Sequence, residues 1–250
     1  MLILKGTKDW GTIDEKERTA FIKGKKHDLP GNAVISEGDV VSIRNEKYDV
    51  LPFNPTLYQH ISMRKAQIIQ PADASYIIAK AGIRSGSRVL ESGVGSGALS
   101  SYILWAVGKE GSLTSIDLDR EAIEITEKNL SKFFDLSNWN RKVGDIKVEQ
   151  DIAGMDAVVL DIIDPWNAIS SAKRILEAGG SLVTYSPTFN QTERTVTEMK
   201  KQNMAVIETT EITKRDLIVR DGSTRPDHNV IGHTAFLTFG IKRSNIEIKV

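Results

Sequence analysis

Four acidic residues stand at or near the ends of successive β-rich segments of the chain. They are Glu91, Asp117, Asp145 and Asp161. When parallel strands form a doubly wound sheet, their carboxyl ends open onto one crevice, in which ligands bind. Carboxylates gathered there attract a cationic ligand. Any one of these acids also fits an ordinary cap or turn, but four at consecutive strand ends favour a binding site.

A glycine-rich turn, "ESGVGSGA", lies beside the first acid and places Gly93, Gly95 and Gly97 between an expected strand and an expected helix. Glycines at such a turn let the backbone approach a nucleotide closely. The string also fits G-x-G-x-x-A, the dinucleotide fingerprint, so an NAD-dependent oxidoreductase and a purely structural turn are both alternatives. The neighbouring acid would repel a pyrophosphate but would attract the sulfonium and ammonium groups of S-adenosylmethionine.

We therefore predict S-adenosylmethionine as the cofactor. The predicted cofactor-binding residues are Glu91, Gly93, Gly95, Ser96, Gly97, Asp117, Asp145 and Asp161.

The fourth acid begins a second unusual string, "DIIDPW", in which Asp161 follows an apolar run and Asp164 comes three residues later. Pro165 stops the strand and suits the first turn of a following helix. Asp164 is expected to cap that helix, with a catalytic role as the alternative. Trp166 is predicted to line a substrate pocket, with packing under the loop as the alternative.

The elements that position these residues alternate regularly after residue 60. Strands are expected at 87–93, 111–119, 139–146, 155–163 and 179–187, and helices at 73–83, 98–108, 120–134, 166–176 and 192–202. Strands that alternate with helices predict a parallel α/β sheet. Two further strands, at 204–219 and 233–242, have no helix between them and should pair as an antiparallel hairpin.

Residues 1–60 have a different pattern, in which short β-rich runs alternate with turn signals such as Glu37-Gly38-Asp39. This pattern predicts a small barrel-like β-domain followed by a linker. We place the domain boundary near residue 60, which gives a β-domain over 1–60 and an α/β domain over 61–250.

Composition narrows the function further. The chain of 250 residues has no cysteine, which excludes disulfides, thiolate metal sites and cysteine nucleophiles. Its four histidines show no metal-ligand spacing. No apolar run reaches the length of a membrane span, and the N-terminus lacks the apolar segment of a signal peptide. We expect a cytoplasmic protein without a membrane partner.

Three longer strings add a specific resemblance: "RKAQIIQPADASYII", "LDIIDPW" and "RPDHNVIGHTAFL". Together with the glycine turn, they resemble motifs of the tRNA (adenine-N1)-methyltransferases of the TrmI group. These are class I S-adenosylmethionine-dependent methyltransferases with a Rossmann-like doubly wound sheet and a C-terminal antiparallel hairpin. The resemblance covers residues 45–242 well and the N-terminal β-domain in outline.

The resemblance implies transfer of a methyl group to N1 of a T-loop adenine, at position 57 or 58 of tRNA, by a homotetramer. It assigns two roles to Asp161. This residue contacts the ammonium group of the donor, and it accepts a hydrogen bond and a proton from the exocyclic amine of the adenine.

Two departures from the family pattern lie at the substrate side. Gln70 replaces a tyrosine or histidine, and Ala72 replaces a lysine. An amide can hydrogen-bond to an adenine edge but stacks poorly. The predicted catalytic residues are Asp161 and Gln70, and the predicted substrate-binding residues are Gln70, Trp166, Arg225 and His233. The alternatives are a class I methyltransferase for a small molecule or protein, and a non-catalytic RNA-binding subunit.

An RNA partner also requires cations, yet the formal net charge is zero. Basic residues must then act locally or through oligomerisation. The candidates are Lys23, Lys25, Lys26, Arg64, Lys65, Arg215, Arg220 and Arg225. A solvated surface explains any single one of them equally well.

Overall fold

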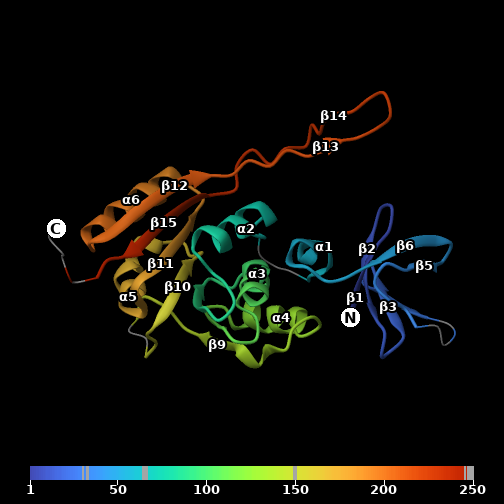
Figure 1. Cartoon of the computed structure of the whole chain (residues 1–250), viewed down its shortest axis with the longest axis horizontal. Coiled ribbons are helices and arrows are strands. Elements are labelled where there is room, and N and C mark those ends of the chain that lie inside the picture. Colours follow the sequence, from blue (N-terminus) through green and yellow to red (C-terminus); the bar gives the residue numbers. More distant parts are fainter. Residues whose placement is uncertain (30, 32–33, 64–66, 149–150, 245, 247–250) are drawn as a thin grey trace.

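The computed structural model describes residues 1–29, 31, 34–63, 67–148, 151–244 and 246. It contains a small antiparallel sheet at the N-terminal end and a larger mixed sheet covered by helices (Figure 1). Arg64 and Lys65, two of the candidate phosphate contacts, lie outside the described residues. Within the described part of the chain, no helix is both long and apolar enough to cross a membrane.

The N-terminal sheet has six strands in the order β4-β3-β2-β1-β6-β5. The strands are β1 (Leu2–Lys5), β2 (Trp10–Asp14), β3 (Thr19–Ile22), β4 (Lys25–Asp28), β5 (Val40–Ile43) and β6 (Glu46–Leu51). Leu4, Ile13 and Val50 form its core with no exposed area. The expected barrel-like unit is an open, curled sheet, because β4 and β5 pair with one neighbour each among the described strands.

The larger sheet has seven strands in the order β12-β15-β11-β10-β7-β8-β9. They are β7 (Arg88–Ser92), β8 (Ser112–Asp117), β9 (Trp139–Val143), β10 (Met155–Leu160), β11 (Leu176–Ser186), β12 (Met204–Glu211) and β15 (Phe236–Lys242). Strands β7 to β11 pair in parallel, whereas β15 runs antiparallel to both β11 and β12. This arrangement confirms the predicted class I methyltransferase fold and its terminal antiparallel strands.

The order of the strands along the chain reverses between β7 and β10. From β7 the chain builds outward through β8 and β9, and from β10 it builds in the opposite direction through β11. Such a switch point leaves a crevice at the carboxyl ends of the two central strands, and ligands bind there in open α/β sheets.

Helices cover both faces of this sheet. They are α2 (Pro71–Lys80), α3 (Ala98–Val107), α4 (Arg120–Leu130), α5 (Ile169–Ile175) and α6 (Phe189–Lys201), with the 3-10 turns η2 (Leu136–Asn138) and η3 (Pro165–Asn167). Alternate residues of β10 enter two separate cores. Val159 faces the core shared with α2 and α3, whereas Val158 and Leu160 face the core shared with α5. A strand buried on both faces explains why its sequence reads as a continuous apolar run.

The segment between β12 and β15, residues 212–235, projects from the sheet as an arm (Figure 1). The expected strand over 204–219 is divided: β12 ends at Glu211, and only the short β13 (Leu217–Ile218) continues in the arm, where it pairs with β14 (Arg225–Pro226). The arm therefore carries mostly exposed side chains away from the body of the molecule.

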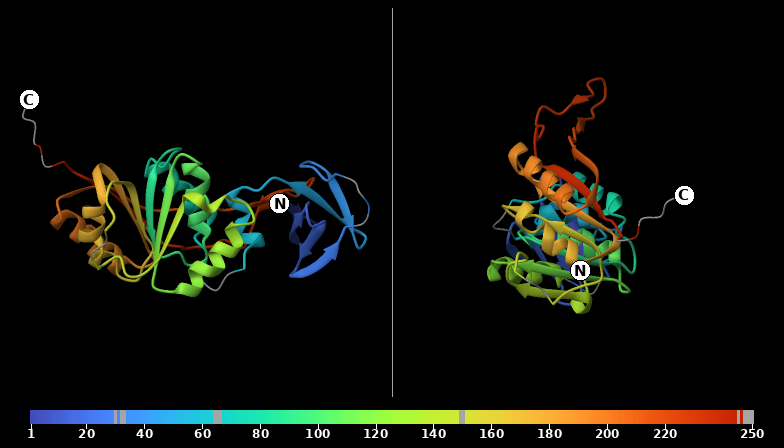
Figure 2. Two further views of the ribbon diagram at one scale, coloured as in Figure 1. Left: turned by 90° about the horizontal axis from the view of Figure 1, so that it is seen from below. Right: turned by 90° about the vertical axis from the view of Figure 1, so that its left-hand side faces the viewer.

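A short helical segment joins the two sheets, formed by η1 (Pro55–Leu57) and α1 (Tyr58–Ile61) (Figure 2). The Tyr58 hydroxyl donates to the Ser96 carbonyl at 3.0 Å and accepts from Asn129 at 3.3 Å. On the other side, the His60 ring stacks on Trp10 of β2 with centroids 4.3 Å apart. The segment thus ties the N-terminal sheet to the glycine turn.

We expect Tyr58→Phe to lower the free energy of unfolding by about 1–3 kcal/mol, because it leaves the buried Ser96 carbonyl without its donor. Urea denaturation measures the loss. Tyr76→Phe is the matched control, since the Tyr76 hydroxyl donates to Glu208 near the surface at 2.6 Å. An equal loss in both variants would show that the buried position of the Tyr58 bond has no special weight.

Candidate functional site

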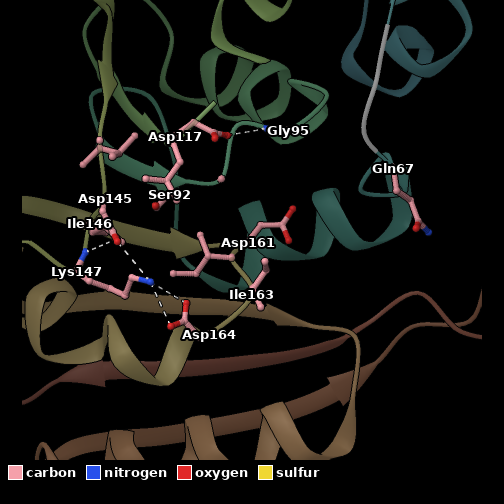
Figure 3. Close-up of a pocket in the computed structure, with 15 residues that line it drawn as sticks. Gln67, Ser92, Gly95, Asp117, Asp145, Ile146, Lys147, Asp161, Ile163 and Asp164 are labelled. Atoms are coloured by element: carbon pink, nitrogen blue, oxygen red, sulfur yellow. Dashed lines mark hydrogen bonds and ion pairs between the residues drawn. The ribbon is translucent and has the colours of Figure 1, made fainter. Parts of the chain in front are cut away.

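A cavity of about 440 Å³ lies at the switch point, at the carboxyl ends of β7, β8, β9 and β10 (Figure 3). Four loops meet around it. They contribute Ser92, Gly93, Gly95, Ile116, Asp117, Leu118, Gly144, Asp145, Ile146, Lys147, Asp161, Ile162, Ile163 and Asp164, and Gln67 completes the lining. The structure thus brings together three of the four predicted acids and two of the three predicted glycines.

The glycines of the turn serve different purposes. A Cβ atom at Gly93 would lie 1.9 Å from the Asp161 carbonyl oxygen, so only glycine allows this turn to pass the end of β10. A Cβ atom at Gly97 would lie 2.4 Å from a methyl carbon of Thr126 in α4. Gly93 and Gly95 line the cavity, whereas Gly97 and the neighbouring Ser96 do not. The latter two pack the turn against α1 and α4.

Asp117 fixes the glycine turn from the end of β8. Its Oδ2 atom accepts from the Val94 amide at 2.7 Å and from the Gly95 amide at 3.3 Å, while Oδ1 accepts from Asp119 at 2.9 Å. The carboxylate is therefore held at the cavity wall by backbone donors. In this position it is able to accept further hydrogen bonds from ligand hydroxyls.

Asp161 stands opposite the turn, directly after β10. Its amide donates to the Ser92 carbonyl at 2.9 Å, which extends the pairing of the two central strands by one bond. Part of the residue is accessible from the cavity, but burial of the carboxyl raises its pKa to about 7, and the nearby charge of Asp117 contributes. Such a group exchanges its proton near neutral pH.

Glu91 was expected at the cofactor, but it does not line the cavity. It is 1% exposed, and its Oε1 atom accepts from Ser100 in α3 at 2.5 Å and from Ser115 in β8 at 2.6 Å. The Glu91 side chain points to α3 and lies one residue deeper in β7 than Ser92, which lines the cavity. Burial raises the pKa of Glu91 to about 7, with Asp117 and Asp161 adding to the shift.

Lys147 is a site residue that sequence reasoning missed. Its Nζ atom lies 3.4 Å from Asp145 Oδ2 and 3.1 Å from Asp164 Oδ1 (Figure 3). The ion pairs join the loop after β9 to the loop after β10 across the cavity rim. The only sequence signal was a cation two residues after a predicted strand-end acid.

Asp164 differs from its expected role as a helix cap. It occupies the N-cap position of η3, but its side chain makes no hydrogen bond to the backbone amides of the turn. Instead it accepts from the Asn167 side chain at 2.8 Å and pairs with Lys147, and both contacts hold the pKa of Asp164 below its usual range. The helix begins as a 3-10 turn, and α5 starts only at Ile169.

Trp166 does not line the cavity that contains Asp161 and Asp164. It packs against the core on the α5 face, and the Arg194 guanidinium lies 3.8 Å from its ring centroid. Because Asp161 follows Leu160, the alternation of β10 directs Asp161 to the opposite face, toward α2. The structure therefore does not bring Trp166 together with the catalytic candidates.

The other predicted substrate-binding residues lie away from this cavity. One lines a second cavity, and two belong to the arm. Gln70 is the N-cap residue of α2 and lines this second cavity. His233 anchors the arm: its Nδ1 lies 2.5 Å from Glu211 and its Nε2 lies 2.7 Å from the Pro187 carbonyl, and the bond to Glu211 raises its pKa. Arg225 lies exposed on β14.

Comparison with known proteins gives a consistent family. The family described as "tRNA methyltransferase complex GCD14 subunit" matches residues 48–224. The tRNA (adenine(57)-N(1)/adenine(58)-N(1))-methyltransferase TrmI of Methanocaldococcus jannaschii is 34% identical over 212 residues, which cover 74% of this chain and 75% of that relative. The tRNA (adenine(58)-N(1))-methyltransferase TrmI of Thermus thermophilus is 28% identical over 94% of both chains.

A solved structure shares the fold of this chain. The crystal structure of a SAM-dependent O-methyltransferase from Thermotoga maritima superposes with a TM-score of 0.82 at 27% identity. The superposition covers 99% of this chain and 94% of the other.

We expect Lys147→Met to weaken S-adenosylmethionine binding by about fivefold, because the two loops at the cavity rim lose their shared cation. Calorimetric titration measures the affinity, and Lys109→Met at an exposed position is the control. Asp164→Asn should have a similar effect, and the double variant should be no weaker than either single variant. Strictly additive effects would mean that the ion pair has no role in cofactor binding.

The raised pKa of Asp161 predicts a pH-dependent stability. Its folded pKa of about 7 exceeds the unfolded value, so the folded state binds more protons between about pH 4 and 7 and stability falls as pH rises through that window. Asp161→Asn should therefore stabilise the ligand-free protein by about 1–3 kcal/mol at pH 8. Denaturation at pH 8 and pH 4 measures this, and a gain of the same size at pH 4 would contradict the assignment.

Proposed function

The chain belongs to the family of tRNA methyltransferase complex GCD14 subunits, and we propose that it transfers a methyl group from S-adenosylmethionine to N1 of a T-loop adenine, at position 57 or 58 of tRNA. The observation that carries this proposal is the position of Asp161. A carboxyl with a pKa of about 7 stands at the end of the central strand and lines one cavity with Asp117 and Asp145.

The cavity suits the cofactor in charge and in shape. S-adenosylmethionine supplies a methyl group activated by a positively charged sulfur. Among the described residues, four carboxylates and one lysine line the cavity, and this lysine, Lys147, is already paired with Asp145 and Asp164. Gly93 and Gly95 present bare backbone, and Leu118 and Ile146 offer apolar surface. A phosphate-bearing cofactor would meet mostly negative charge here.

Asp161 supplies the acid–base chemistry. Attack by the N1 lone pair needs chiefly alignment, but the product is cationic unless the exocyclic amine loses a proton. Asp161 accepts a hydrogen bond from that amine and takes the proton. A cation bound beside Asp161 lowers its pKa and keeps it ionised before the reaction.

The substrate side combines polar recognition with local positive charge. Gln70 offers an amide donor and an acceptor to a base edge. The arm carries Lys214, Arg215, Arg220 and Arg225, which suit phosphate contacts. Assembly as a homotetramer would gather several such arms around one RNA and offset the zero net charge of the single chain. A tRNA substrate would place the protein in the cytoplasm.

The test is incubation with unmodified tRNA transcript and radiolabelled S-adenosylmethionine, followed by nucleoside analysis. We expect label in 1-methyladenosine, and its loss when the adenines at positions 57 and 58 are replaced. Asp161→Asn should lower the rate by about 10²–10⁴-fold, since it removes a general base, while Asp164→Asn should retain most of the turnover at saturating donor.

Failure would be equally clear. If the protein binds the donor but places no label in tRNA, it methylates another substrate. Full activity of Asp161→Asn would leave the RNA substrate in place but would remove Asp161 from the chemistry.

A further inference from the structure

A second cavity, of about 180 Å³, lies between the first turn of α2 and the base of the arm. Gln70 and Asp73 contribute from the helix, while Lys214, Asn229 and Thr234 contribute from the arm. None of these residues lines the cavity that we assign to the cofactor. Two segments far apart in the sequence thus create a separate polar pocket.

The main feature of this pocket is a buried acid. Asp73 is 1% exposed, and neither of its carboxylate oxygens has a partner with full hydrogen-bond geometry in the described part of the chain. Burial raises its pKa, and the neighbouring hydroxyls of Thr234 and Tyr185 offset this effect only in part. The Thr234 hydroxyl is itself buried and also lacks such a partner among the described residues.

The first turn of α2 does not supply hydrogen-bond donors to the Asp73 carboxylate. Asp73 stands in the first turn of α2, where a negative charge is favourable. However, the N-cap residue Gln70 makes no side-chain cap bond, and the Asp73 carboxylate accepts no backbone amide of the turn. A buried carboxylate whose neighbouring donors are poorly aligned is costly, so Asp73 is able to accept further hydrogen bonds from a ligand.

The strand register connects this pocket to Asp161. Leu160 of β10 pairs with Thr184 of β11, so the residues that follow, Asp161 and Tyr185, are neighbours at the end of the sheet. Tyr185 packs on the same face as α2, and its pKa is raised by burial and by the charges of both Asp73 and Asp161. The second pocket therefore adjoins the proposed catalytic acid on its α2 side.

We propose that Asp73 forms the floor of an RNA subsite next to the reacting base, where its carboxylate accepts a hydrogen bond from an uncharged donor of the substrate. This inference rests on the proposed function. The uncharged donors of a nucleotide include the ribose 2′-hydroxyl and the exocyclic amine of a base. The amides of Gln70 and Asn229 at the same pocket suit the remaining polar atoms of a nucleotide, and Lys214 suits its phosphate.

The test uses Asp73→Asn, which keeps the shape of the side chain but removes an acceptor, in the full-length protein. The matched control is Asp151→Asn, an exposed acid that lines neither of the two cavities. The substrates are T-arm stem-loop RNAs with single 2′-deoxy substitutions at the target and neighbouring nucleotides, and RNAs with single bases that lack the exocyclic amine.

We expect Asp73→Asn to weaken RNA binding and raise KM for RNA by about tenfold or more, because a hydrogen bond to a charged acceptor is lost. The control should change neither. For one of the modified RNAs, the wild-type protein should lose affinity by about the same factor. Asp73→Asn should bind that RNA as well as it binds the unmodified RNA. A 2′-deoxy RNA with this behaviour identifies the ribose as the donor, and an amine-lacking RNA identifies the base.

Additive losses for every modified RNA, or a fall in kcat with unchanged KM and RNA affinity, would overturn the proposal. Either result would make Asp73 a positioning residue for Tyr185 and Thr234. RNA affinity is measured by fluorescence anisotropy without a methyl donor, so it does not depend on turnover. Absence of methylation by the wild-type protein together with normal RNA binding would count against the proposed function and leave this subsite intact.

Discussion

The close approach of Gly93 to the Asp161 carbonyl is the constraint on which the site depends. The two central strands β7 and β10 end side by side, and the Asp161 amide donates to Ser92 at 2.9 Å. There is no room for a side chain on the turn that follows β7, since a Cβ atom at Gly93 would lie 1.9 Å from the Asp161 oxygen. One contact therefore fixes both the glycine turn and the proposed catalytic acid, and it fixes them relative to each other.

The same convergence concentrates negative charge in a small volume. Asp117 and Asp161 line the cavity, and Glu91 lies just behind the turn with one unpartnered oxygen in the described structure. Burial and, to a lesser extent, the charges of the neighbouring carboxylates raise the pKa values of Glu91 and Asp161 to about 7. The ligand-free site is thus electrostatically strained, and a cationic ligand relieves the strain when it binds.

Most of the fold could be predicted from local sequence patterns. Alternating strands and helices and the final antiparallel strands were predictable, because apolar periodicity is a property of neighbouring residues. The strand-end positions of Asp117, Asp145 and Asp161 were predictable for the same reason. The orientation of Glu91 toward α3 could not be predicted, because the sequence does not mark which of the last residues of a strand reaches the crevice.

Contacts between distant segments could not be read from the sequence. Lys147 pairs with Asp164 across two loops, and the arm meets the first turn of α2 at Asp73. Asp164 looked like a helix cap because Asp-Pro commonly starts a helix, but the cation from another loop holds its carboxylate. These contacts depend on register and loop path, which single-sequence periodicity does not contain.

The Tyr58 contact has a thermodynamic consequence for the whole molecule. Tyr58 bonds to the carbonyl of Ser96 in the glycine turn, and two residues further along the His60 ring stacks on Trp10 of the N-terminal sheet. A ligand bound to the N-terminal sheet that moved this segment would also move the glycine turn at the cofactor cavity. Such a coupling would have the same free energy in both directions, because linkage is reciprocal.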